Sequence, residues 1–169
     1  MKRRLIMIRK AKIDDISALL EIYNENILNG TASFEEKALI FDEGKEWLTE
    51  HQGEYPLIVF EEEDELLGFA SLSPYGRQRE TAYCCAEISI YVSTMAQGQG
   101  VGSRLMDAII EEGKQSPKIK QLISVITDGN QGSIHLHEKK GFSYGGRLEN
   151  IAEKQGKMLS MVFYQKECT

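Results

Sequence analysis

The sequence predicts a mixed α/β fold, and three observations predict it. Short runs rich in β-branched residues and bounded by turn residues recur along the 169 positions, which is typical of strands. Longer runs with apolar residues every three or four positions lie between some of them, which is typical of amphipathic helices. One such helix separates Cys84–Val92 from Leu122–Ile126, and a helical crossover of this kind joins parallel strands. We therefore expect antiparallel strands plus one parallel pair, in a single domain over residues 1–169.

The first half of the chain is expected to hold a strand, two helices and a hairpin. Asp14 and Asp15 lie where the dipole of the first helix favours acids, and Asn29-Gly30 ends that helix. The acidic run Glu61–Glu65 separates two apolar segments and indicates a solvated hairpin turn. In order, we expect a strand at Leu5–Arg9, a helix from Ile13 to Ile27, a loop at Asn29–Phe34, a helix at Asp42–His51, and strands at Leu57–Phe60 and Leu66–Leu72.

The second half is expected to alternate strands and helices. A loop at Tyr75–Glu80 precedes it. A turn rich in glycine follows the first of its strands, and residues 142–166 have room for two final strands. In order, we expect a strand at Cys84–Val92, a helix at Val101–Gln115, a strand at Leu122–Ile126, a helix at Gln131–Lys140 and two strands between Phe142 and Lys166.

Composition narrows the class of protein. The net charge is −6, from 20 basic and 26 acidic residues, and no basic block is present, so non-specific nucleic-acid binding is not expected. No run approaches the roughly 20 apolar residues of a membrane span. Cys84, Cys85 and Cys168 lack metal-ligand spacing, and an odd, sparse count suits a reducing compartment. We expect a cytoplasmic protein with no metal and no nucleic-acid or membrane partner.

A glycine-rich turn at Gln97–Ser103 is the sharpest functional signal. Successive backbone N–H groups between a strand and a helix can converge on an anion, and the helix dipole adds positive potential, so a phosphate or diphosphate is the natural ligand. The P-loop pattern GxxxxGK[ST] has no match here. The dinucleotide pattern GxGxxG fits only with Ser103 as its last position and after several antiparallel strands, which is not its usual place. A connector that binds nothing remains open.

The same turn matches the pattern Q-x-x-G-x-G through Gln97, Gly100 and Gly102, and here the chain resembles the GNAT N-acetyltransferase superfamily. Within it, the chain is similar to the phosphinothricin acetyltransferase-like branch. The resemblance runs from the first strand to the end of the chain. It is carried by Ile22–Asn24, Gly30–Phe34, Arg77–Arg79, Ala86–Val92, Leu136–Phe142 and Ile151–Lys157.

This resemblance implies a fold, a co-substrate and an acceptor. The implied GNAT fold has a mixed, mostly antiparallel central sheet, a parallel pair of strands splayed at the cofactor site, and helices on both faces. The implied co-substrate is acetyl-CoA, and the implied acceptor is the primary amine of a small amino-acid-like compound of the phosphinothricin, methionine sulfone or methionine sulfoximine type. A homodimer is implied as well.

Glu87 is the candidate general base. Side chains alternate along a strand, so Glu87, Ser89 and Tyr91 share one face. A carboxylate inside a mostly apolar strand costs free energy unless it is solvated or paired, so an exposed acid is one interpretation. The other is functional, because an ammonium must lose a proton before it attacks a thioester and a partly desolvated Glu suits that task. The resemblance implies a catalytic Glu at this position.

Three polar residues lie along one face of the helix that follows the second parallel strand. Asn130, Ser133 and His137 are spaced i, i+3 and i+7, and Asn130 is also a natural N-cap. The resemblance implies that Asn130 contacts the pantetheine arm and that His137 protonates the departing CoA thiolate, which a histidine can do near neutral pH. A packed or surface histidine is the alternative for His137.

The cofactor is expected to lie along the glycine-rich turn and the end of the strand before it. The resemblance implies that backbone amides of the turn hold the diphosphate, while a backbone N–H near the strand end polarises the thioester carbonyl. The expected cofactor-binding residues are Ile90, Tyr91, Val92, Gln97, Gly98, Gln99, Gly100, Val101, Gly102, Ser103, Asn130 and Ser133.

The acceptor side is expected to involve Phe34, Arg77, Arg79 and Glu87. Arginine suits bidentate recognition of a carboxylate, although two solvated surface arginines are an alternative. The chain departs from the branch at Cys85, where relatives usually have Thr, and at Ala82, where they usually have Tyr. Because both positions are near the expected acceptor pocket, the reaction class stands while the acceptor is open.

Direct attack in a ternary complex is the expected mechanism. A covalent acetyl-cysteine at Cys84 or Cys85 is possible in principle, but no histidine partner is evident in the sequence. The alternatives are a protein N-terminal or lysine acetyltransferase of the same fold, a module that binds acyl-CoA without catalysis, and a nucleotide binder.

Overall fold

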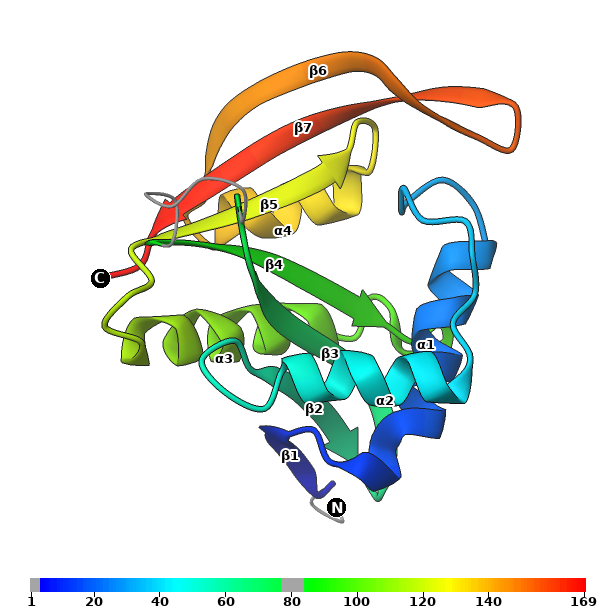
Figure 1. The fold of residues 1–169 in the computed structure, drawn as a ribbon, viewed down its shortest axis with the longest axis vertical. Helices are drawn as coiled ribbons and strands as arrows, with labels where there is room; N and C mark the ends of the chain where they lie inside the picture. The colour runs from blue at the N-terminus through cyan, green and yellow to red at the C-terminus, as the bar shows by residue number, and fades with distance from the viewer. Residues whose placement is uncertain (1–3, 77–83) are drawn as a thin grey trace.

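A computed structural model describes residues 4–76 and 84–169 of the chain. Figure 1 shows one curved sheet with helices packed against it. In chain order the elements are β1 (Ile6–Lys10), the 3-10 helix η1 (Ile13–Asp15), α1 (Ile16–Leu28), α2 (Phe41–Glu50), β2 (Leu57–Glu62), β3 (Glu65–Pro74), β4 (Cys85–Val92), the 3-10 helix η3 (Thr94–Ala96), α3 (Val101–Gln115), β5 (Gln121–Thr127), α4 (Gln131–Lys139), β6 (Ser143–Lys154) and β7 (Lys157–Glu167).

The strands of the described part of the chain form one seven-stranded sheet with the order β1-β2-β3-β4-β5-β7-β6. All neighbours pair antiparallel except β4 and β5, which are parallel, as the helical crossover through α3 predicted. The parallel pairing covers only Cys85–Glu87 against Gln121–Ile123. Beyond those residues the two strands diverge (Figure 1). The predicted mixed α/β fold with a splayed parallel pair is confirmed.

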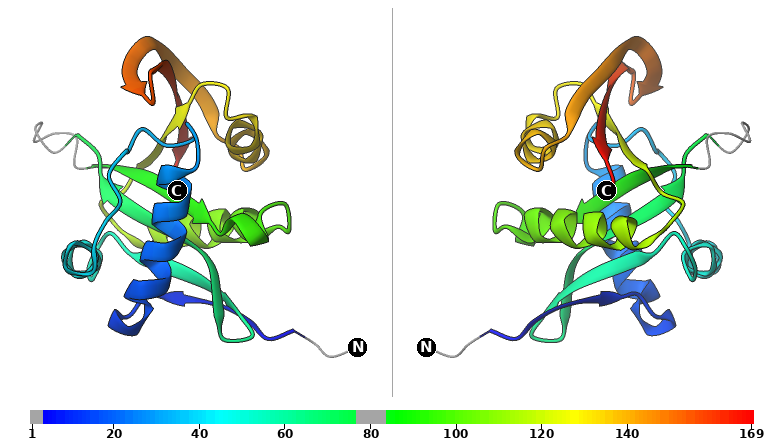
Figure 2. Two further views of the ribbon diagram at one scale, coloured as in Figure 1. Left: turned by 90° about the vertical axis from the view of Figure 1, so that its right-hand side faces the viewer. Right: turned by 90° about the vertical axis from the view of Figure 1, so that its left-hand side faces the viewer.

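Two apolar clusters lie on opposite faces of the sheet. One packs α3 on the inner strands, with Leu105, Met106 and Ile109 against Ile88 and Leu122. The other packs α1 on β2 and β3 and includes partly buried Trp47 of α2. The side views place α3 and α4 on one side of the sheet and α2 on the other (Figure 2). Residues that alternate along β4 therefore face different helices: Ala86 and Ile88 face α3, whereas Tyr91 faces α1.

The structure shifts two boundaries that the sequence predicted. The helical spacing from Ile13 begins with η1, and α1 proper begins at Ile16. The acidic run is a hairpin turn only at Glu63 and Asp64, whose φ angles are 51° and 67°, because the flanking acids continue the strands. No helix among residues 4–76 and 84–169 is both long and apolar enough to span a bilayer.

Candidate active site

The divergence of β4 from β5 leaves one backbone edge of β4 without a neighbouring strand. The Ser93 amide donates to the Leu67 carbonyl of β3, so odd-numbered residues of β4 direct their backbone groups toward β3. By alternation, Ile88, Ile90 and Val92 direct theirs toward β5, which pairs only as far as Glu87. A free N–H edge of this kind can polarise a carbonyl oxygen that enters between the strands.

The predicted glycine-rich turn lies at the end of that edge. Gly98 and Gly100 have φ angles of 74° and 84°, and a Cβ built on either contacts nothing within 4 Å. Gly100 is the N-cap of α3, whose first amides have no partner within the helix. The side-chain Nε2 of Gln97 donates to the Val92 carbonyl at 3.4 Å, and the side-chain Nε2 of Gln99 donates to the Met95 carbonyl at 3.0 Å. Both side chains therefore stabilise the loop. The turn has the geometry of an anion site at a helix N-terminus.

Helix α4 lies beside β5, across the divergence from this edge. The Asn130 side chain accepts a hydrogen bond from the Ser133 amide at 3.3 Å, so the predicted N-cap is confirmed. The Ser133 carbonyl oxygen lies 2.7 Å from Nδ1 of His137, and the Ser124 hydroxyl of β5 lies 2.7 Å from Nε2. His137 is 5% exposed and its ring packs edge-on against Phe142.

These contacts define the state of the His137 ring. A carbonyl oxygen only accepts hydrogen bonds, so Nδ1 carries a proton, and in the neutral ring Nε2 accepts from the Ser124 hydroxyl. Burial lowers the pKa of His137, and the bond to the Ser133 carbonyl only partly offsets this effect. The neutral ring holds no proton on Nε2, so general-acid catalysis by His137 requires the protonated form and stays a prediction.

Glu87 lies on the opposite face of the sheet, beside a pocket of about 380 Å³. Its partner in the β3–β4 register is Ser73, and the next pair on the same face is Ser71 with Ser89. These three serines form the floor of the pocket. Its walls come from α1, α2, the loop between them and the end of β4: Tyr23, Glu35, Leu39, Glu43, Glu46, Trp47, Glu50 and Tyr91. The alternation predicted from the sequence therefore places the candidate base next to a cavity.

Burial and a neighbouring charge act together on Glu87. Desolvation raises the pKa of its carboxyl group, and the nearby carboxylate of Glu35 raises it further. Burial likewise raises the pKa of Tyr91. The Tyr91 ring lies 5.2 Å from both Phe69 and Tyr23, so its side chain belongs to the pocket face of the sheet. A carboxyl group with a raised pKa beside a cavity is suited to take a proton from an ammonium.

The remaining predicted acceptor residues are placed only in part. Phe34 is half-buried in the loop between α1 and α2, next to Glu35. Arg77 and Arg79 lie outside the described residues, as does Ala82.

Sγ of Cys84 lies 3.9 Å from Sγ of Cys85, and burial raises the pKa of Cys85. A raised pKa leaves less of the nucleophilic thiolate at neutral pH, which disfavours an acetyl-cysteine intermediate at Cys85.

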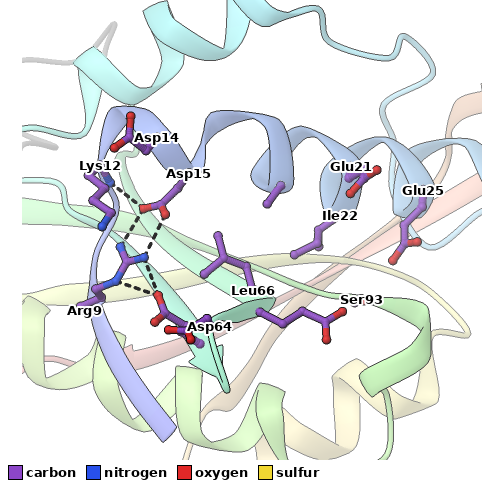
Figure 3. Close-up of a pocket in the computed structure, with 13 residues that line it drawn as sticks. Arg9, Lys12, Asp14, Asp15, Glu21, Ile22, Glu25, Asp64, Leu66 and Ser93 are labelled. Carbon is purple, nitrogen blue, oxygen red and sulfur yellow. Dashed lines mark hydrogen bonds and ion pairs between the residues drawn. The ribbon is translucent and has the colours of Figure 1, made fainter. Parts of the chain in front are cut away.

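A second cavity, of about 690 Å³, lies between α1, β1 and the β2–β3 turn (Figure 3). Arg9 lies at one end of it (Figure 3) and makes two hydrogen bonds to Asp15, at 2.7 and 2.9 Å, and two to Glu61, at 2.6 and 3.0 Å. These ion pairs tie β1 to β2 and to η1. None of the predicted site residues lines this cavity, and Arg9 is held by these structural contacts.

Sequence reasoning missed three features of the site. Ser124 was not singled out, because its contact with His137 joins a strand to a helix 13 residues later. The acidic wall on α2 follows from the spacing of Glu43, Glu46 and Glu50, which share one helical face and could have been found as a charged stripe. The serine floor follows from alternation along β3 and β4.

Comparison with known proteins identifies relatives over nearly the whole length. A model of the acetyltransferase (GNAT) family matches residues 18–142. The chain is 31% identical over 160 residues to an L-methionine sulfoximine/L-methionine sulfone acetyltransferase of Pseudomonas aeruginosa, covering 94% of this chain and 92% of the relative. It is 31% identical over 170 residues to a phosphinothricin N-acetyltransferase of Alcaligenes faecalis, covering 94% and 81%.

Solved structures share the fold over the same length. A ribosomal-protein-alanine N-acetyltransferase from Brucella melitensis superposes with a TM-score of 0.91 at 35% identity, covering 95% of this chain and 99% of that one. The acetyltransferase yncA from Salmonella typhimurium, solved with its cofactor acetyl-CoA, superposes with a TM-score of 0.93 at 28% identity, covering 98% and 95%.

Proposed function

The chain belongs to the acetyltransferase (GNAT) family, and on that premise we propose that it transfers the acetyl group of acetyl-CoA to the primary amine of a small amino-acid-like acceptor. The family expected from the sequence is confirmed, and the relatives named for methionine sulfoximine and phosphinothricin support the expected branch. The observation that carries the proposal is the placement of Glu87 beside a pocket on one face of the diverging strands, with the glycine-rich turn at their far end.

In the proposed reaction, the amine nitrogen attacks the thioester carbonyl carbon. The acceptor ammonium first loses one proton to Glu87, directly or through water. The neutral amine then forms the N–C bond as the C–S bond breaks, and the nitrogen loses a second proton as the amide forms. CoA leaves as a thiolate that takes up one proton, so the net reaction releases one proton to solvent. Residues 97–103 hold the diphosphate through their backbone amides, and the free edge of β4 at Ile90 and Val92 polarises the carbonyl. Asn130 and Ser133 at the start of α4 contact the pantetheine arm.

The thiolate receives its proton at the α4 side of the divergence. His137 supplies it when protonated, and the buried Ser124 hydroxyl lies 2.7 Å from its Nε2. Because Nδ1 is bound to a backbone carbonyl, the ring keeps one orientation while Nε2 changes its protonation state. The proposal places the enzyme in the cytoplasm as a homodimer, and the three free cysteines suit that compartment.

Acetylation of a protein N-terminus is the second candidate function. The similarity to the ribosomal-protein-alanine N-acetyltransferase supports it, because that relative is named for a protein substrate. The small-molecule acceptor is favoured here because the relatives named for methionine sulfoximine and phosphinothricin match nearly the whole chain.

The test combines binding with turnover. Titration calorimetry with acetyl-CoA, CoA and NAD should detect the first two ligands, and tight NAD binding without CoA binding would end the proposal. Release of CoA thiol with methionine sulfone as acceptor should exceed release with an alanine-terminated peptide panel. Faster acetylation of the peptides would favour the second candidate.

A matched pair of variants tests the base. Glu87→Gln should lower kcat/KM by roughly 10²-fold or more while the Kd for acetyl-CoA stays unchanged. Glu65→Gln, an exposed glutamate at the opposite end of β3 from Ser73, the register partner of Glu87, serves as the control. Since the pKa of Glu87 is raised and the base must be ionised, kcat/KM of the parent should fall as pH drops, at a higher pH than an ordinary glutamate titrates. A Glu87→Gln variant with the control's rate would remove Glu87 from the mechanism.

A further inference from the structure

We propose that the physiological acceptor carries a second group that is positively charged at neutral pH, so that the substrates are basic amino-acid derivatives or diamines whose distal ammonium or guanidinium binds in the pocket beside Glu87. This inference rests on the proposed function and narrows its acceptor class. It comes from the charge, the aromatic walls and the floor of that pocket.

Charge is the first observation. Four glutamates line the pocket: Glu35 from the loop and Glu43, Glu46 and Glu50 from α2. The described lining residues include no lysine and no arginine. Glu43 pairs with Lys37 at 2.6 Å, whereas no ion pair is described for Glu35, Glu46 or Glu50 within residues 4–76 and 84–169. An anionic side chain entering this pocket meets repulsion, whereas a cation meets attraction from several carboxylates.

The aromatic wall is the second observation. The Trp47 ring lies 5.3 Å from Phe69 and 6.0 Å from Tyr23, and Tyr23 lies 5.2 Å from Tyr91. Three of these rings, Tyr23, Trp47 and Tyr91, line the cavity itself. Ring faces attract ammonium and guanidinium groups, and guanidinium also stacks on them. Carboxylates at the rim with aromatic rings inside are the combination that recognises an organic cation.

A hydroxyl in the floor without a protein partner is the third observation. Ser71 is 2% exposed and lines the pocket, and no hydrogen bond of its hydroxyl is described. It pairs in register with Ser89, and that pair lies two residues along the strands from Ser73 and Glu87. A hydroxyl that lines a cavity without a protein partner can accept a hydrogen bond from an ammonium or guanidinium group bound there.

The register also sets the distance between the two acceptor groups. Two residues of strand place the Ser71–Ser89 pair roughly 7 Å from Glu87, and Tyr91 lies roughly 13 Å from it. An acceptor whose amine reaches Glu87 therefore places a side chain of several carbons along the floor toward Trp47 and Tyr91. In Figure 1, α2 lies in front of β3 and carries the acidic wall over this path.

The test uses two acceptors that differ only in charge. L-arginine amide and L-citrulline amide each offer one α-amine, and their side chains end in a guanidinium and a neutral urea of similar shape. We expect kcat/KM for L-arginine amide to be at least about tenfold higher, and the ratio to shrink as ionic strength rises. Equal rates, or faster acetylation of L-citrulline amide, would overturn the inference.

Variants assign the preference to the pocket. Glu46→Gln combined with Glu50→Gln should lower the arginine-to-citrulline ratio several-fold, because two of the four pocket carboxylates are removed. Asp42→Asn, on the same helix but outside the pocket, is the control and should keep the ratio of the parent. A ratio that survives the double variant would contradict the inference.

Methionine sulfone separates this inference from the proposed function. Turnover of methionine sulfone at a rate above that of L-arginine amide would refute the cationic acceptor while the N-acetyltransferase assignment stands. Absence of both acetyl-CoA binding and turnover of every amine would refute the assignment itself, and the inference with it.

Discussion

Lys154 is a buried ammonium whose removal should weaken both the fold and the acceptor loop. It lies near the end of β6 and is 2% exposed. Its Nζ donates to the Ile27 carbonyl at 2.8 Å, in the last turn of α1, and to the Ser33 carbonyl at 2.9 Å, in the loop that carries Phe34. One side chain therefore fixes the helix end and the loop to the β6–β7 hairpin.

The expected cost of Lys154→Met follows from these contacts. Methionine keeps most of the aliphatic stem, so the change removes the charge and leaves two carbonyl oxygens unpartnered, each worth roughly 1–3 kcal/mol. The variant no longer desolvates an ammonium, which offsets part of this loss. The net destabilisation should be about 2–4 kcal/mol. At roughly 2–4 °C per kcal/mol, the Tm should fall by about 4–16 °C.

The assay is urea unfolding of the variant beside a matched control. Lys157→Met changes an exposed lysine of the same hairpin and should change the free energy of unfolding by less than about 0.5 kcal/mol. In Lys154→Met, the KM for the acceptor should also rise more than the KM for acetyl-CoA, because the released loop borders the acceptor pocket. An unfolding free energy equal to that of the control would refute the reasoning.

Three further changes have defined outcomes. Thr127→Val removes a buried hydroxyl that has no hydrogen-bond partner, so the free energy of unfolding in urea should rise by about 1 kcal/mol; a loss of stability would contradict this. Burial lowers the pKa of His137 below its usual 6.5, so the stability that this neutral ring confers is lost as pH falls through its folded-state pKa. His137→Gln should therefore flatten the decline of stability on acidification, and an unchanged slope would show that other groups cause it. Gly100→Ala places a side chain at a φ of 84° and should cost about 1 kcal/mol of stability and weaken acetyl-CoA binding, whereas equal affinity to a Gly53→Ala control would argue against the turn as the anchor.

The sequence predicted features of the site that depend on local rules. Alternation placed Glu87 on the face opposite Ile88, glycine and helix-start signals placed the glycine-rich turn, and capping chemistry placed Asn130. The helical crossover also predicted that β4 and β5 are parallel.

Contacts between distant segments were beyond the same rules. Lys154 reaches a carbonyl 127 residues earlier, and no spacing in the sequence encodes that distance. The acidic stripe of α2 becomes a pocket wall only because α2 packs over β3 and β4, which depends on the fit between Trp47 and Phe69. Ser124 and His137 meet because α4 packs on β5 at one particular register.

The most direct test of the account is a crystal structure of the protein with acetyl-CoA bound. We predict the diphosphate on the backbone amides of residues 98–103, the thioester carbonyl at the free edge of β4 near Ile90 and Val92, and the Glu87 carboxylate facing the acetyl group from the pocket side. A coenzyme bound elsewhere, with this turn empty or with Glu87 directed away from the thioester, would contradict the account.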